Sequence, residues 1–327
     1  MEPPPRAQLF LLTAGFMVTQ SVGVVVRLGL AELVTARPRT TDRLAAAAGA
    51  DPDATRRLVR TLASVGVFDV RDGVVVHTPM SELLQRDVEG SFAAQAEILS
   101  GLQYGTWADA LETFRSGEPA FPRVHGSPVF DWFTEHPEHA ALFNDAMAGG
   151  AVARREPLRA RDWTGVRTVV DVGGGSGETL VQLLLDLPDV RGTVLDLAQV
   201  EPQARERFAA AGVADRAAFV AGSFFRSVPA GADVYVLSAI LHDWNDDDAA
   251  RILQTVRTAM RLDSLLLLAE AVIRPGNELD PAKLLDLHML VLLGGRERSE
   301  HEWRALLDRG GFTAQSVRPG IIEARPR

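Results

Sequence analysis

The chain has 327 residues, a length that fits two domains better than one. A net charge of −9 argues against a general binder of nucleic acid, and 46% hydrophobic residues are enough for a sizeable core. Because the sequence contains no cysteine, disulfides, thiolate metal sites and cysteine catalysis are excluded.

The N-terminal residues are expected to be part of the folded protein. Residues 1–6 lack the basic-then-apolar order of a secretion signal. The apolar stretch Leu9–Leu30 is interrupted by polar residues, among them Gln20 and Arg27, and predicts buried helices better than a membrane span. We therefore expect a cytoplasmic protein with no membrane partner.

The first third of the chain predicts a winged helix-turn-helix. Helices are expected at Ser21–Thr35, after the hydroxyl cap at Thr40 and after Asp51. The apolar runs Val67–Val70 and Val74–Thr78 flank an Asp-Gly turn and predict a hairpin. Three short helices followed by a hairpin are typical of this motif.

Two functions are open for the winged helix. Arg56, Arg57 and Arg60 on its third helix would suit contact with DNA. However, three arginines in an acidic chain are a weak electrostatic footprint for a DNA-binding protein. The alternative, a dimerisation module that shares the shape, is favoured because a fold does not fix a function.

Residues 91–160 are expected to be helical and irregularly aromatic, with prolines 119, 122 and 128 interrupting the middle. Most of these aromatic side chains should pack in a core. Some are expected to line a pocket beside the next domain.

From Arg167 onward, strands and helices alternate. Strands are expected at Arg167–Val172, Thr193–Asp196, Ala217–Ala221, Val234–Ser238 and Leu265–Ala271. Helices are expected at Glu178–Leu187, Glu201–Gly212, Asp247–Leu262, Pro281–Leu293 and Glu300–Gly311, and two closing strands at Ala314–Val317 and Ile321–Ala324. This alternation predicts an open, mostly parallel sheet whose ligands lie at the carboxyl ends of the strands.

A glycine-rich turn follows the first of these strands. The strand ends in an acid, Asp171, and the turn leads into the helix that starts at Glu178. The turn contains Gly173, Gly174, Gly175 and Gly177. Glycine allows a sharp turn and the close approach of a cofactor, and Asp196, about 20 residues further on, could accept both hydroxyls of a ribose. The turn and the acid by themselves leave NAD and S-adenosylmethionine equally open.

Three residues near strand ends could carry chemistry. His242 could take a proton from a substrate hydroxyl, since an unperturbed imidazole has a pKa of roughly 6.5. Glu270 and Glu297 could fix its tautomer, because a carboxylate bonded to one ring nitrogen leaves the other free to accept a proton. For Glu297 the alternative is a surface pair with Arg296 or Arg298.

Six short motifs occur in order along the chain, and taken together they resemble those of a known family. They are Asp171–Gly177, Leu195–Leu197, Gly222–Phe225, Leu241–Trp244, Ala269–Glu270 and Gly294–Ser299. They resemble the S-adenosylmethionine-dependent O-methyltransferases of the plant caffeate and flavonoid type and their bacterial natural-product relatives. The resemblance covers nearly the whole chain and favours S-adenosylmethionine over NAD.

The resemblance implies an α/β fold: a Rossmann-like class I methyltransferase domain with an N-terminal all-helical winged-helix dimerisation domain. It implies three parts, a dimerisation domain at residues 1–90, a helical linker and substrate-pocket segment at 91–160, and a catalytic domain at 161–327. It also implies a homodimer formed through the N-terminal domain.

The resemblance further assigns site residues. His242 is implied as general base, flanked by Glu270 and Glu297. The implied cofactor residues are Asp171, Gly173, Gly174, Gly175, Asp196, Leu197, Ser223, Phe224, Phe225 and Ser238. The implied acceptor residues are Phe143, Met147, Asp243 and Met289. No metal site is expected.

The expected function is methyl transfer to a hydroxyl, expected to be phenolic, on a small aromatic natural product. C- or N-methylation and a methyltransferase-like hydroxylation on the same scaffold are alternatives, and a cofactor-sensing DNA-binding regulator is an alternative of another class. Many family members have aspartate in place of Ser223 and lysine in place of Ser238, so two charged contacts near the adenine are expected to be missing. The loop before Gly294 is shorter than in plant members, which argues against a plant-like phenylpropanoid acceptor.

Overall fold

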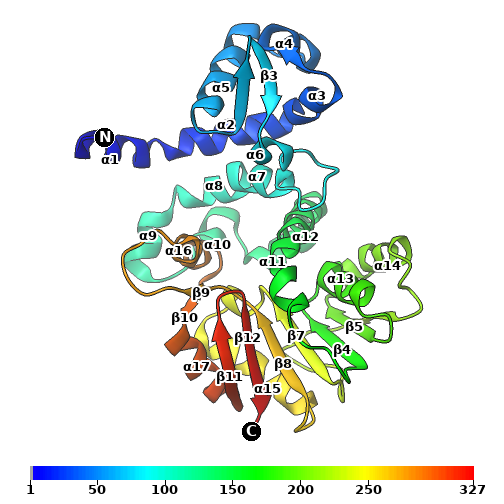
Figure 1. Ribbon diagram of the computed structural model, residues 1–327. Helices are drawn as coiled ribbons and strands as arrows, with labels where there is room; N and C mark the ends of the chain where they lie inside the picture. Colours follow the sequence, from blue (N-terminus) through cyan, green and yellow to red (C-terminus); the bar gives the residue numbers. More distant parts are fainter. Residues whose placement is uncertain (1–2) are drawn as a thin grey trace. The chain divides into compact units, whose positions relative to one another are not determined.

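The computed structural model describes residues 3–327 and divides into two compact units (Figure 1). The first runs up to Gly105 and includes Ala141–Gly150, and the second comprises Thr106–Ala140 and Ala151–Arg327. The three-part division at residues 90 and 160 stays a prediction.

The first unit has the predicted winged-helix arrangement, but the single helix expected at Ser21–Thr35 is wrong. Its helices are α1 (Pro5–Thr13), α2 (Gly15–Arg27), α3 (Leu30–Ala36), α4 (Thr41–Ala48), α5 (Pro52–Ser64), α6 (Pro79–Glu82) and α7 (Ala93–Ser100). Helix α2 ends at Arg27 and α3 begins at Leu30, after Gly29 with its left-handed backbone. The hairpin strands β2 (Phe68–Arg71) and β3 (Val74–His77) pair antiparallel, and the short strand β1 (Arg39–Thr40) pairs with β3. Asp72 and Gly73 form the turn with left-handed backbone angles, as the Asp-Gly sequence predicts.

Helix α1 is exposed, which corrects the prediction that Leu9–Leu30 forms buried helices. Leu9, Phe10 and Leu12 are 63%, 64% and 79% exposed, whereas α2 buries Val25 and Val26. Within the described residues, Pro5–Arg27 is the one stretch long and apolar enough to cross a membrane, with 17% of it buried. Sequence hydropathy does not distinguish a helix that packs within its own chain from one that packs on a second chain.

Among the described residues, four short helices and one longer one follow. They are α8 (Leu102–Trp107), α9 (Ala110–Ser116), α10 (Phe121–His125), α11 (Val129–Glu135) and the longer α12 (Pro137–Arg159). Proline lies at or next to the first residue of α10, α11 and α12. Residues 141–150 of α12 belong to the first unit, and residues 151–159 belong to the second.

The second unit is built on a seven-stranded sheet with the order β11-β12-β8-β7-β4-β5-β6. Its strands are β4 (Thr168–Val172), β5 (Arg191–Asp196), β6 (Ala217–Ala221), β7 (Val234–Ser238), β8 (Leu265–Ala269), β11 (Phe312–Arg318) and β12 (Ile321–Pro326). Strands β4 to β8 are parallel, and β12 runs antiparallel to both β8 and β11. The predicted α/β fold is confirmed.

Helices cover both faces of this sheet. They are α13 (Glu178–Asp186) and α14 (Glu201–Ala210) on one face, and α15 (Asp246–Ala259) and α17 (Glu300–Arg309) on the other. Alternate residues of β7 divide between the two cores, with Val234 and Val236 in the first and Tyr235 and Leu237 in the second. A strand that is buried on both faces has an uninterrupted apolar sequence, and this explains why the positions of these strands could be predicted.

The order in which the strands are added to the sheet reverses at β4. Strand β5 lies on one side of β4 and β7 on the other, so the crossovers that leave this point run in opposite directions. The carboxyl ends of β4, β7 and β8 therefore border a switch point, where α/β sheets bind ligands.

Candidate active site

His242 lies in the short 3₁₀ helix η2 (Leu241–Asp243), just past β7. Ala239 between them has a left-handed backbone (φ 55°), a conformation that costs a non-glycine residue on the order of 1 kcal/mol. Glu270 stabilises this turn, because its Oε1 accepts hydrogen bonds from the backbone N–H groups of Ile240 (2.9 Å) and Leu241 (2.8 Å). Glu270 follows β8 directly, one residue beyond the observed strand end.

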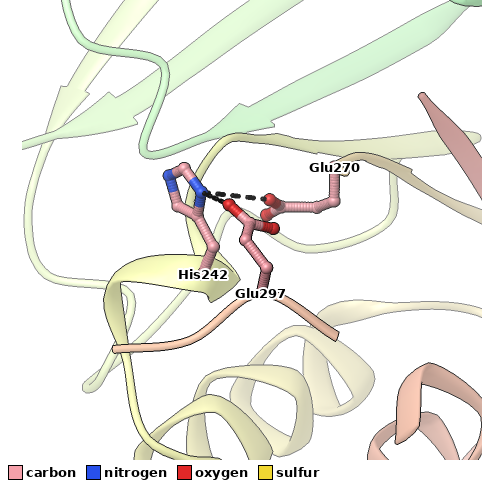
Figure 2. A group of neighbouring side chains, drawn as sticks. All are labelled: His242, Glu270 and Glu297. Carbon is pink, nitrogen blue, oxygen red and sulfur yellow. Dashed lines mark hydrogen bonds and ion pairs between the residues drawn. The ribbon is translucent and has the colours of Figure 1, made fainter. Parts of the chain in front are cut away.

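Two glutamates from separate segments meet at one nitrogen of the His242 ring (Figure 2). Nδ1 of His242 is 2.6 Å from Oε1 of Glu297 and 4.0 Å from Oε2 of Glu270. Both glutamate side chains are fully buried, and the histidine side chain is 13% exposed. The structure thus brings together the three residues that the sequence predicted to meet.

The segment that carries Glu297 is fixed to the rest of the site. Strands β9 (Val272–Ile273) and β10 (Arg298–Ser299) pair in parallel, so the residues that follow Glu270 and Glu297 lie side by side. The backbone N–H of Glu297 donates to Asp286 (2.9 Å) on α16 (Pro281–Leu293), and that of Arg296 donates to the carbonyl of His242 (2.8 Å).

The alternative in which Glu297 pairs with a neighbouring arginine at the surface is wrong. Arg296 pairs with Asp246 and Glu302, and the buried Arg298 pairs with Asp246. Arg298 also donates to backbone carbonyls around η2. Adjacent charges of opposite sign do not reveal from sequence alone which of them pair.

A third carboxylate faces the other nitrogen of the ring. Oδ1 of Asp243 is 3.3 Å from Nε2 of His242. Burial by itself lowers the pKa of His242, but the three surrounding carboxylates outweigh it and raise that pKa to about 10. Burial also raises the pKa of the Asp243 carboxyl to about 7, although the charged imidazole opposes this shift. The surrounding carboxylates therefore shift the pKa of His242 upward from the unperturbed value assumed from the sequence.

The glycine turn forms a tight cradle after β4. Gly173 and Gly175 have left-handed φ angles of 72° and 55°. A Cβ on Gly174 would lie 2.5 Å from Oδ2 of Asp171, whereas one on Gly175 would have no atom within 4 Å. Asp171 is fully buried, and among residues 3–327 neither of its carboxylate oxygens has a hydrogen-bond partner. Burial and the nearby Asp196 raise its pKa to about 7.

Asp196, at the end of β5, is tied to the glycine turn. Its Oδ2 accepts from the N–H of Gly175 (2.7 Å) and its Oδ1 from that of Leu197 (2.6 Å). Burial raises the pKa of Asp196. The carboxylate is thereby held at the edge of the turn, and the side chain of Leu197 beside it is exposed.

Phe224, one of the residues predicted near the adenine, adjoins the same turn. A Cβ on Gly173 would lie 3.3 Å from the ring of Phe224, which therefore borders the turn. The N–H of Phe225 donates to Oγ of Ser223 (3.3 Å). Trp244, which sequence reasoning did not select, makes edge contacts with Phe224 and Phe225 at centroid distances of 6.0 and 4.7 Å.

The predicted acceptor residues lie in both units. Asp243 is next to His242, and Met289 is buried on α16. Phe143 and Met147 lie on the part of α12 that belongs to the first unit, and their role stays a prediction. Sequence reasoning missed His288, whose Nδ1 accepts from the indole N–H of Trp107 (3.0 Å) and whose pKa burial lowers to about 4.

Two protein-family models match the chain, one in its N-terminal part and one in the rest. The family model described as O-methyltransferase domain matches residues 107–313, and the model described as O-methyltransferase dimerisation domain matches residues 10–87.

Individual relatives match along nearly their whole length. The chain is 39% identical to the phenazine O-methyltransferase PhzM of Lysobacter antibioticus over 99% of this chain and 97% of that protein. It is 33% identical to the phenazine-1-carboxylate N-methyltransferase of Pseudomonas aeruginosa, over 97% of this chain and 95% of that protein. A solved structure of the O-methyltransferase NcsB1 from neocarzinostatin biosynthesis, in complex with S-adenosylmethionine and 2-hydroxy-5-methyl naphthoic acid, matches with a TM-score of 0.79 and 34% identity, covering 95% and 96% of the two chains.

Proposed function

The chain belongs to the O-methyltransferase family, and from this premise we propose that it methylates a phenolic hydroxyl of a small aromatic natural product, with His242 as the general base. The methyl donor of this enzyme is S-adenosylmethionine. The proposal rests on one observation, the His242 imidazole hydrogen-bonded to buried Glu297 and placed beside buried Glu270 at the carboxyl edge of the sheet. The aromatic acceptor is supported by the acceptors named for the phenazine relatives and for NcsB1.

The residues at the switch point fit the cofactor. Gly175 leaves open space over the turn, and Asp196 at the end of β5 presents a carboxylate suited to ribose hydroxyls. The two unpaired oxygens of buried Asp171 suit a cationic group, because a buried carboxylate without a partner is costly. The proposed cofactor set includes Leu197, Ser223, Phe224, Phe225 and Ser238.

When bound, S-adenosylmethionine supplies a methyl group that is already activated by the sulfonium. The protein therefore has to align the acceptor and remove its proton. In the proposed mechanism Nε2 of neutral His242 would accept the proton of the acceptor hydroxyl, so that the oxygen can take up the methyl group. Glu297 holds the N–H at Nδ1 and balances the charge, while Glu270 fixes the turn that carries His242.

The product of one assay tests the acceptor class. Purified enzyme is incubated with S-adenosylmethionine and a hydroxylated phenazine, and the product is analysed by mass and by NMR. We expect a gain of one methyl group and an O-methyl proton shift. An N-methyl shift would favour N-methylation, the second candidate, which the Pseudomonas relative supports. Binding of S-adenosylhomocysteine without turnover of hydroxylated aromatic compounds would refute the acceptor class.

The pH dependence of activity tests the charges around His242. Only the neutral imidazole accepts a proton, and because the pKa of His242 is raised to about 10, kcat/KM should rise with pH through the range up to that value. Asp243→Asn removes a negative charge 3.3 Å from Nε2, so it should lower this pKa and move the rising limb to lower pH.

The profile of each variant is measured with the same acceptor, so that ionisation of the acceptor is common to all. Asp189→Asn, at a side chain that is 85% exposed, is the matched control and should leave the profile unchanged. A limb that stays in place in Asp243→Asn would show that Asp243 does not set the pKa of His242.

We also propose a cytoplasmic homodimer formed through the N-terminal domain, with no nucleic-acid or membrane partner. The dimerisation-domain match and the exposed apolar side chains of α1 support this assembly. Arg56 pairs with Asp42 and Asp53, and Arg57 also pairs with Asp53, which reduces the positive charge available to DNA. These pairs weigh against the cofactor-sensing regulator.

A further inference from the structure

Arg154, near the end of α12, is a cation at the edge of the cofactor site. It belongs to the second unit, together with the sheet. Its Nε donates a hydrogen bond of 3.0 Å to Oγ of Ser238, the last residue of β7. The positive charge that is absent from residue 238 itself is thus present beside it, on a helix that precedes the sheet in sequence.

The surroundings of Arg154 are acidic. The carboxylates that act on its charge are those of Glu270, Asp171 and Asp243. Burial lowers the pKa of Arg154, but an arginine stays charged at any pH at which the enzyme works. Arg154 therefore places a fixed positive charge among the acids at the ends of β4, β7 and β8.

The amino-acid end of S-adenosylmethionine carries an ammonium and a carboxylate. Asp171, with two unpaired carboxylate oxygens, suits the ammonium, but an acid-lined edge would repel the carboxylate. A guanidinium presents planar N–H groups that match a carboxylate. We propose that Arg154 binds the carboxylate of the cofactor's amino-acid end and that Ser238 holds the guanidinium in place for this contact.

The experiment compares ligands that differ in this carboxylate. Dissociation constants are measured by calorimetry for S-adenosylmethionine, for S-adenosylhomocysteine and for decarboxylated S-adenosylmethionine. In Arg154→Met, binding of the first two should weaken by about 10- to 100-fold, the range for a lost hydrogen bond between charged groups. Binding of the decarboxylated ligand should change by less than about 3-fold, since it lacks the group that Arg154 binds.

Variants of neighbouring residues control the experiment. Arg155→Met removes the adjacent arginine, which pairs with Asp186, and should leave all three constants near wild type. Arg154→Lys keeps the charge and should restore part of the affinity for the two carboxylate ligands. Ser238→Ala should weaken these two ligands in the same sense as Arg154→Met, but by less.

Two results would overturn the proposal. An equal loss for all three ligands in Arg154→Met would show a structural role. If Arg154→Met instead bound both S-adenosylmethionine and its decarboxylated form more tightly than the wild type, Arg154 would only offset the acidic charges. Retained binding of the decarboxylated ligand also reports that the variant is folded, so the outcome does not depend on enzyme activity.

Discussion

Replacement of His242 by alanine is expected to lower kcat by about 10²- to 10⁴-fold, the contribution typical of a general base. The dissociation constant for S-adenosylhomocysteine should change little, because the glycine turn and Asp196 belong to other strand ends. Initial rates with a hydroxylated aromatic acceptor and calorimetry with S-adenosylhomocysteine measure the two quantities separately.

A second variant distinguishes the loss of the base from a loss of stability. In His242→Ala, three carboxylates remain together without the imidazole that faces them, and buried unpaired charge is destabilising. His242→Gln can still donate a hydrogen bond toward Glu297 but cannot act as a base near neutral pH, so the same loss of kcat is expected with less change in Tm. His301→Ala, at an exposed histidine on α17, is the matched control. Near wild-type turnover in both His242 variants would show that another group takes the proton.

The fold and the positions of His242 and Glu270 were predictable because their sequence signals are local. Each central strand is an apolar run that ends where a turn or polar residue begins, and His242 and Glu270 follow such runs directly. The glycine turn needs left-handed backbone at Gly173 and Gly175, which few other residues adopt. Position relative to a strand end was therefore enough to bring these residues to one edge of the sheet.

The features that sequence reasoning missed depend on contacts between distant segments. The raised pKa of His242 follows from three carboxylates whose distances no spacing rule gives. Arg154 lies within a long helix, where nothing in the sequence separates it from Arg155, although one donates to Ser238 and the other pairs with Asp186. The exposure of α1 likewise depends on what packs against it, and a single chain does not contain that information.

Gly295 shows how the loop that carries Glu297 depends on one missing side chain. A Cβ on this residue would lie 2.2 Å from the carbonyl oxygen of His242 and 2.6 Å from the carbonyl carbon of Asp243. Both are backbone atoms, so no rotamer change removes the clash. The loop or η2 would have to move apart, and the 2.6 Å contact between His242 and Glu297 bridges these two segments.

Gly295→Ala is therefore expected to lower kcat by about 10²-fold, the cost of misplacing catalytic groups by about 1 Å. Affinity for S-adenosylhomocysteine should stay near wild type, since the glycine turn lies on β4 and not on this loop. Gly105→Ala, where an added methyl meets no atom within 4 Å, is the matched control. The clash involves backbone atoms, so a side-chain rotation cannot relieve it. An unchanged kcat in Gly295→Ala would therefore contradict the prediction and mean that the loop and η2 shift together and keep the histidine–glutamate contact.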